Sequence, residues 1–187
     1  MSTSTLYDST YAALQLLLPK VLDSQLENLA LITASAAQTQ SAHLGKLARA
    51  LPLAATQDSK EQRIRRFLDN PRIARASHYH PIVRHALAGI TQQRVDLVLD
   101  RVLLNARHNL LVASVGFRRR SVPLAWQSLD HVGSSALESQ KAVLGEALAE
   151  LPASAQVTVY ADSEFRSTEL FDWLRQPGHD VLLGIRG

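Results

Sequence analysis

The chain has 187 residues, 46% of them hydrophobic, which is enough for one substantial domain or for a domain with a helical extension. It contains no cysteine, so disulfides, thiolate zinc sites and cysteine nucleophiles are excluded, and a cytosolic setting is expected. The N-terminal apolar run is short and has no basic segment before it, so we expect neither export nor insertion into a membrane.

The net charge of +3 hides an uneven distribution of charged residues. Residues 43–85 contain nine Lys or Arg against three Asp or Glu, whereas residues 1–42 contain one Lys against three acidic residues. A polyanion such as DNA, or an acidic membrane surface, is the natural partner of such a basic segment. A solvated helix face is the alternative, because it gives a similar pattern.

Residues 1–90 are predicted to form helices, because Leu and Ala recur at spacings of three and four residues and β-branched runs are scarce. One helix is expected to start at Ser24, and a second to start at Ser41 and stop at Pro52. A third is expected to start at Asp58 and to continue through QRIRRFLDN. Ser24 and Asp58 are each followed by Glu three residues later, which is the spacing of a capping box.

Two short helices followed by a basic one can form a DNA-binding unit of the helix-turn-helix type. A small helical bundle with solvated arginines is the alternative. The third helix is expected to turn its apolar residues inward and its arginines outward. Those apolar residues are Ile64, Phe67 and Leu68. The candidate DNA contacts of this helical region are Lys46, Arg49, Arg63 and Arg66.

From Arg94 the pattern changes to alternating, β-branched residues, which predicts a second region over residues 91–187. The expected strands are RVDLVLD, NLLVASVGFRRR, SVPLAWQSL, QVTVYAD and DVLLGIRG, with one helix starting at Ser135 and another in STELFDWLRQPG. Pro123 indicates that the third strand lies near a sheet edge. A three-stranded meander, a helix, a parallel fourth strand, a helix and a fifth strand is the order of the ribonuclease H-like α/β fold. The apolar first and fourth strands are expected to be central and covered on both faces.

Asp100 and Asp162 end the first and fourth predicted strands, which are neighbours in such a sheet. Both carboxylates would then meet at one edge and share divalent ions. Phosphoryl transfer uses two Mg²⁺ ions roughly 3.5–4 Å apart, and hard ions require hard oxygen ligands. Asp100 and Asp162 are therefore the candidate catalytic residues and the candidate ligands of a two-metal site for Mg²⁺ or Mn²⁺. The alternative is that each Asp is a turn former or a helix cap.

Two other acidic residues lie near this pair in the sequence. Asp96 shares a strand face with Asp100 but lies at the beginning of the strand, so Asp100 is preferred. Glu164 is expected to assist Asp162 without binding metal itself. Arg118, Arg119 and Arg120, at the predicted hairpin turn, are candidate phosphate contacts, with surface solvation as the alternative for each.

Residues 95–187 resemble the catalytic domain of DDE transposases of bacterial insertion sequences, in the family-four group with a YREK-type signature. The matching pieces are LVLD, RRRSVPLAW, HVGSSALES and YADSEFRSTELFDWLR, which occur in the order and spacing of that family. DSEF is a close variant of the usual DREF-like run, and Val102 stands where a threonine is common. The helical half is similar, more diffusely, to the region with which such enzymes grip transposon-end DNA.

The resemblance implies metal-dependent nicking at insertion-sequence ends, followed by attack of the freed 3′-hydroxyl on target DNA. The partner would be double-stranded DNA in the bacterial cytoplasm, at the nucleoid, and a homodimer on DNA is one option for the assembly. Asp100 and Asp162 would be the first two acidic ligands. The third, a glutamate on a helix after the fifth strand, and the YREK-like motif have no counterpart up to Gly187. We therefore expect a truncated or decayed transposase that binds end DNA weakly and cuts it little or not at all.

Two other functions fit the same residues. One is a non-catalytic DNA-binding regulator or inhibitor derived from a transposase. The other is a host nuclease or resolvase of the same fold, which would cut structured or hybrid substrates without needing element ends. A small-molecule enzyme is not indicated, because the sequence has no glycine-rich phosphate loop and no Ser-His-Asp pattern.

Overall fold

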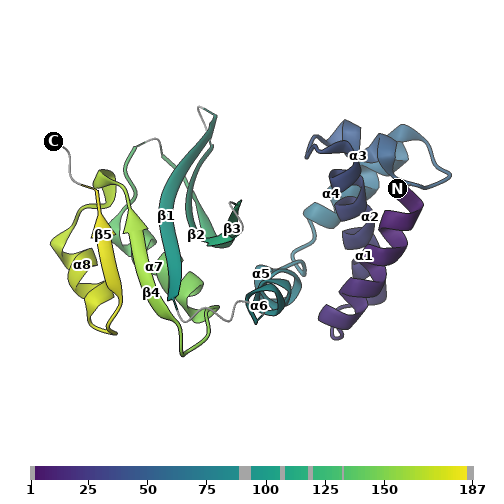
Figure 1. Cartoon of the computed structure of the whole chain (residues 1–187). Helices are drawn as coiled ribbons and strands as arrows, with labels where there is room; N and C mark the ends of the chain where they lie inside the picture. The colour runs from purple at the N-terminus through teal and green to yellow at the C-terminus, as the bar shows by residue number, and fades with distance from the viewer. Residues whose placement is uncertain (1–2, 89–93, 106–107, 118–119, 132, 185–187) are drawn as a thin grey trace. The chain divides into compact units, whose positions relative to one another are not determined.

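The computed structural model describes residues 3–88, 94–105, 108–117, 120–131 and 133–184. The chain divides into two compact units, Met1–His85 and Ala86–Gly187 (Figure 1). Within the described ranges, none of the helices combines the length and the hydropathy that crossing a bilayer requires.

The first unit is helical, as the spacing of Leu and Ala predicts. Its helices are α1 (Thr3–Leu17), α2 (Asp23–Thr39), α3 (Leu44–Ala50), α4 (Gln57–Leu68) and α5 (Arg75–His78), and most of α6 (His80–Ala88), which continues past the boundary at His85. One cluster of buried side chains consists of Leu14, Leu18, Leu26 and Ala30, from α1, the turn after it and α2. A second cluster consists of Leu31, Leu47, Ala48, Leu51 and Ile64. It joins α2, α3 and α4.

The starts of these helices differ from the predicted caps. Leu22 precedes α2, so Ser24 lies inside the first turn and does not cap the helix. Thr56 caps α4, because its Oγ1 accepts a hydrogen bond from the Ser59 amide at 3.3 Å, and Asp58 is therefore already helical. The expectation that Leu68 faces the core was also wrong. Leu68 is the last residue of α4 and is 64% exposed, beyond the buried Ile64 and Phe67.

The second unit is an α/β unit built on one mixed sheet, as predicted. Its strands are β1 (Arg94–Asn105), β2 (His108–Phe117), β3 (Arg120–Leu129), β4 (Gln156–Ala161) and β5 (Asp180–Leu183), in the order β3-β2-β1-β4-β5. The first three strands are antiparallel neighbours, whereas β4 runs parallel to both β1 and β5. β3 is an edge strand, which confirms the expectation from Pro123. The connecting helices are α7 (Leu137–Ala149), the 3₁₀ turn η1 (Ser163–Phe165) and α8 (Thr168–Arg175).

Helices cover one face of this sheet. α7 packs against β2 and β3 and contacts α8, which packs against β5. Along β1, Leu97 and Leu99 are buried on the covered face, while Asp96, Val98 and Asp100 are exposed on the other. The expectation that helices cover both faces was therefore wrong for β1 in the described part of the chain, because both connecting helices pack on the same side.

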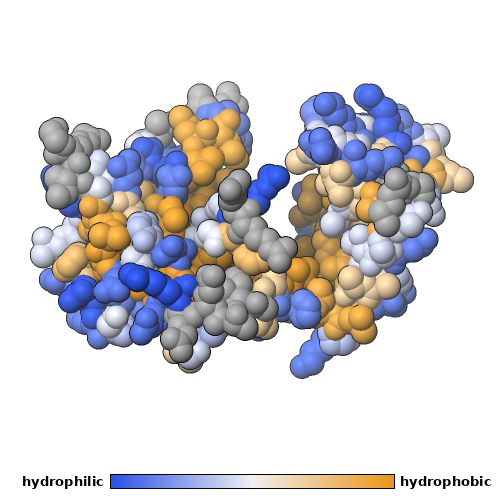
Figure 2. Space-filling view, in the orientation of Figure 1, coloured by the Kyte–Doolittle hydropathy of each residue, from blue (hydrophilic) through white to orange (hydrophobic). Residues whose placement is uncertain are grey.

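The exposed side of β1 is partly apolar. Val98, Val102 and Leu104 are 37%, 40% and 61% exposed, and the strand continues past Asp100 to Asn105. In Figure 2 hydrophobic surface gathers over this end of β1 and β2. Asp100 thus lies on a strand face that carries both charged and apolar exposed side chains. The buried side chains point to the opposite face.

Candidate functional site

The parallel register of β1 and β4 brings the two predicted site residues to neighbouring strands. Leu99 pairs with Ala161, and Asp100 and Asp162 are the residues that follow this pair. Leu99 and Ala161 are buried, whereas both aspartates are exposed. Because successive side chains of a strand point to opposite faces, Asp100 lies on the open face of the sheet. Asp162 lies directly after β4 and begins the turn η1.

Each carboxylate has one oxygen held by the backbone amide of the next residue. Asp100 Oδ1 accepts a hydrogen bond from the Arg101 amide at 2.7 Å, and Asp162 Oδ1 accepts one from the Ser163 amide at 2.5 Å. Among the described residues, nothing donates a hydrogen bond to the second oxygen of either group. These second oxygens can therefore accept a cation or a proton donor from a ligand.

The structure adds Arg101, a residue that the sequence did not single out. Its Nε donates to Glu164 Oε1 at 2.9 Å and its Nη2 to Glu164 Oε2 at 2.6 Å, which makes a two-pronged ion pair. Its Nη1 donates to the carbonyl of Gly133 at 2.9 Å, in the loop between β3 and α7. We call these three residues the Arg101 clamp. The clamp ties the strand of Asp100 to the turn of Asp162.

The clamp is only partly accessible to solvent. The side chains of Arg101 and Glu164 are 26% and 20% exposed. The hydrogen bonds with Glu164, with a smaller contribution from the charge of Asp100, raise the pKa of Arg101 above its usual value. The guanidinium therefore stays charged, and Glu164 is engaged in the ion pair. Glu164 thus makes a specific contact with Arg101, and the expectation that it assists Asp162 without binding metal stays a prediction.

Gly184 approaches Asp162 from the end of β5. Its amide donates to the Ala161 carbonyl at 2.9 Å. A Cβ atom at this position would lie 2.9 Å from the Ser163 nitrogen and 3.2 Å from Asp162 Oδ1. Only glycine fits here without displacing the turn. The position of the Asp162 carboxylate therefore depends on the absence of a side chain at residue 184.

Asp96 is separated from this group. It pairs with Thr158 near the beginning of β1 and β4, four residues from Asp100. At the rise of a strand, this separation is about 13 Å. Asp96 therefore provides a matched control for the charge of Asp100.

Comparison with protein-family models and with curated proteins finds no match for this chain. Its function therefore has to be inferred from the geometry of the residues. Among those that the structure describes, no group of three His, Asp or Glu side chains is arranged to hold a metal ion. A site formed by Asp100 and Asp162 thus offers two carboxylates, with Glu164 taken by Arg101.

The candidate DNA contacts fall into three groups. Lys46, Arg49, Arg66 and Arg120 are exposed, as a contact with a phosphate requires. Arg118 and Arg119 lie outside the described residues. Arg63 differs from the others, because its Nη2 lies 3.3 Å from Glu27 Oε2 and its Nε donates to Asn28 Oδ1 at 2.6 Å. The expectation that Arg63 simply points outward is corrected, since it is half-buried and joins α4 to α2.

Proposed function

We propose that this chain acts on DNA as a protein of the DDE transposase type, with Asp100 and Asp162 as its acidic ligands. The observation that supports the proposal is the pairing of Leu99 in β1 with Ala161 in β4, because Asp100 and Asp162 are the residues that directly follow this pair. The strand order β3-β2-β1-β4-β5 is compatible with the ribonuclease H-like fold and supports the same interpretation.

The donor set fits a hard divalent ion. Asp100 and Asp162 each offer an exposed carboxylate oxygen, which is the ligand type that Mg²⁺ and Mn²⁺ prefer. Such an ion supplies Lewis acidity that stabilises negative charge on phosphoryl oxygens. The protein contributes the positions of the carboxylates: the Arg101 clamp joins β1 to the turn after β4, and Gly184 leaves room beside the Asp162 carboxylate.

Cleavage by the 187-residue chain is expected to be weak or absent. Two carboxylates hold a second divalent ion poorly, and two-metal chemistry needs both ions. Glu164, the nearest further carboxylate in sequence, is neutralised by Arg101. A non-catalytic regulator that occupies DNA is therefore the second candidate function, favoured by this same ion pair.

The helical unit is proposed to supply affinity for DNA. Residues 43–85 carry an excess of six positive charges, nine basic against three acidic. Such a segment attracts the phosphate backbone without regard to base sequence and makes binding strongly dependent on salt. Target and end specificity would then come from further contacts with base edges.

Two assays with the full chain test the proposal. Anisotropy of a labelled duplex in EDTA should show binding that weakens as salt increases. Nicking of a supercoiled plasmid in Mg²⁺ or Mn²⁺ should be slow and should disappear in Asp100→Asn but persist in Asp96→Asn. Binding without any nicking would favour the regulator. Fast multiple-turnover nicking would contradict the expectation of weak cleavage, and nicking that survives Asp100→Asn would contradict the assigned site.

A further inference from the structure

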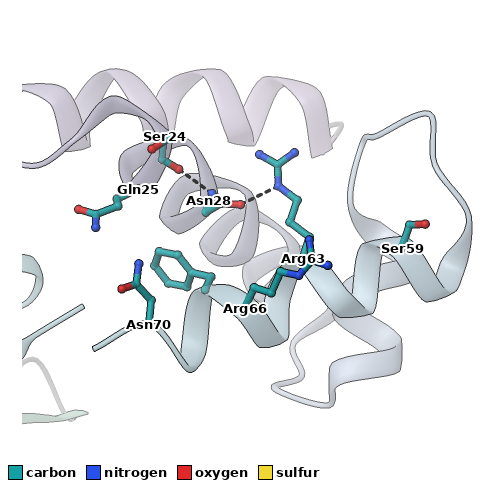
Figure 3. A pocket seen from close by; sticks show the side chains of 8 residues that line it. Ser24, Gln25, Asn28, Ser59, Arg63, Arg66 and Asn70 are labelled. Atoms are coloured by element: carbon teal, nitrogen blue, oxygen red, sulfur yellow. Dashed lines mark hydrogen bonds between the residues drawn. The ribbon is translucent and has the colours of Figure 1, made fainter. Parts of the chain in front are cut away.

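A hollow of about 370 Å³ lies between α2 and α4 in the first unit (Figure 3). This volume is within the range of small-ligand sites. Its lining is mainly polar, includes Arg63 and Arg66, and contains no carboxylate. A neighbouring hollow of about 300 Å³ along α4 shares Ser59 and Arg66 with it and is also lined by Asp58. Arg66 thus borders both spaces.

Arg63 forms a fixed wall of the hollow. Its Nε donates to Asn28 Oδ1 at 2.6 Å, and Asn28 Nδ2 donates to the Ser24 carbonyl at 2.6 Å. Figure 3 shows Asn28 joined to both neighbours by these two bonds. Glu27, 3.3 Å from the Arg63 guanidinium, offsets its charge. Arg63 is therefore already engaged and has little left to offer a ligand.

Arg66 has the opposite character. It is exposed, and no hydrogen bond or ion pair holds its guanidinium among the residues that the structure describes. It lies three residues after Arg63, a spacing that puts both on one side of the helix. Asn70 Oδ1 accepts a hydrogen bond from the Arg72 amide at 3.0 Å, so the Asn70 Nδ2 group remains a donor. The Gln25 amide also borders the space.

The hollow between α2 and α4 thus has the free guanidinium of Arg66 beside amide donors, and no carboxylate lines it. This combination of groups is complementary to a phosphate. Arginine binds phosphate oxygens with two parallel N–H bonds, and Asn and Gln are common donors to the DNA backbone. We propose that this hollow binds one backbone phosphate of double-stranded DNA, with Arg66 in direct contact and Arg63 shaping the wall. This inference rests on the proposed DNA-binding function and identifies one of its contacts.

Arg65 offers a matched control, because it is an exposed arginine of the same helix and does not line either hollow. Arg66→Gln and Arg65→Gln are compared in the full chain by anisotropy with a duplex of mixed sequence in EDTA. We expect Arg66→Gln to weaken binding about tenfold at low salt and to reduce the slope of log K against log salt by about one. Arg65→Gln should change the affinity less than about threefold. Circular dichroism checks that both variants remain folded.

The outcomes separate this inference from the proposed catalytic function. Equal losses in the two variants, or no loss in Arg66→Gln, would overturn the phosphate site while leaving DNA binding intact. A larger loss of DNA affinity in Arg66→Gln than in Arg65→Gln would support the site even if no nicking is found. In a second arm, inorganic phosphate is titrated against the side-chain amide NMR signals of Gln25 and Asn70. Shifts of these signals that depend on Arg66, combined with unchanged DNA affinity in Arg66→Gln, would assign the hollow to a free phosphate ligand and contradict the proposal.

Discussion

Arg101 and Glu164 form a two-pronged ion pair, with Nη2 2.6 Å from Oε2 and Nε 2.9 Å from Oε1. The two residues are 63 positions apart in the sequence, and each lies beside one of the candidate metal ligands. Arg101 follows Asp100 directly, and Glu164 is two residues after Asp162. The pair therefore fixes the turn after β4 against β1.

Removing either partner of this ion pair should destabilise the second unit, and the loss should be larger when Arg101 is replaced than when Glu164 is replaced. Arg101→Gln leaves the mostly buried Glu164 carboxylate without its partner, at a cost of about 1–3 kcal/mol. Glu164→Gln should cost less, because its amide oxygen still accepts a hydrogen bond from the guanidinium. Urea denaturation of both single variants and the double variant measures the coupling. Additive effects would show that the contact contributes nothing.

Replacing Gly184 with alanine should move the Asp162 turn. The added Cβ would lie 2.9 Å from the Ser163 nitrogen, so the backbone has to shift, and we expect a loss of about 1–3 kcal/mol. Gly116→Ala is the control, because a Cβ there has no neighbour within 4 Å. Thermal denaturation compares the two. Equal melting temperatures would contradict the close approach of β5 to Asp162.

The helical unit carries a tyrosine whose titration reports its fold. The hydrogen bond from Tyr11 to Asp23 raises the pKa of Tyr11 to about 12. The folded chain then holds a proton that the unfolded chain releases near pH 10, so the stability from this group is present below about pH 10 and declines as the pH rises to about 12. Absorbance at alkaline pH should show a late-titrating component from Tyr11. It should disappear in Tyr11→Phe and shift to lower pH in Asp23→Asn, and an unchanged titration in Asp23→Asn would contradict the contact.

Sequence periodicity was sufficient for the five strands and for the helices α2, α3, α4, α7 and α8, but it did not separate α1, α5 and α6 within the helical region. It was not sufficient for the helix caps. The capping-box spacing indicated Asp58 as the cap of α4, whereas Thr56 caps this helix. The open face of β1 could have been predicted, because charged residues at Arg94, Asp96 and Asp100 alternate with Val95, Leu97 and Leu99.

The pairing of Leu99 with Ala161, directly before Asp100 and Asp162, follows from local patterns and strand order, and so could be anticipated. The Arg101 clamp could not be anticipated. It depends on the strand β1, the turn after β4 and the loop carbonyl of Gly133 meeting in three dimensions. One signal was present in the sequence. Arg101 follows Asp100 directly and Glu164 follows Asp162 by two positions, so the two motifs carry opposite charges next to their aspartates, which is compatible with a contact between them.

The most direct test measures how tightly the full chain binds Mn²⁺, with the free ion quantified by electron paramagnetic resonance. The wild type is compared with Asp100→Asn, Asp162→Asn and Asp96→Asn. We predict that the wild type and Asp96→Asn bind Mn²⁺ alike, and that each of the other two variants loses about tenfold or more in affinity, as expected when a charged ligand is removed. Equal Mn²⁺ affinity in all four proteins would contradict a metal site formed by Asp100 and Asp162.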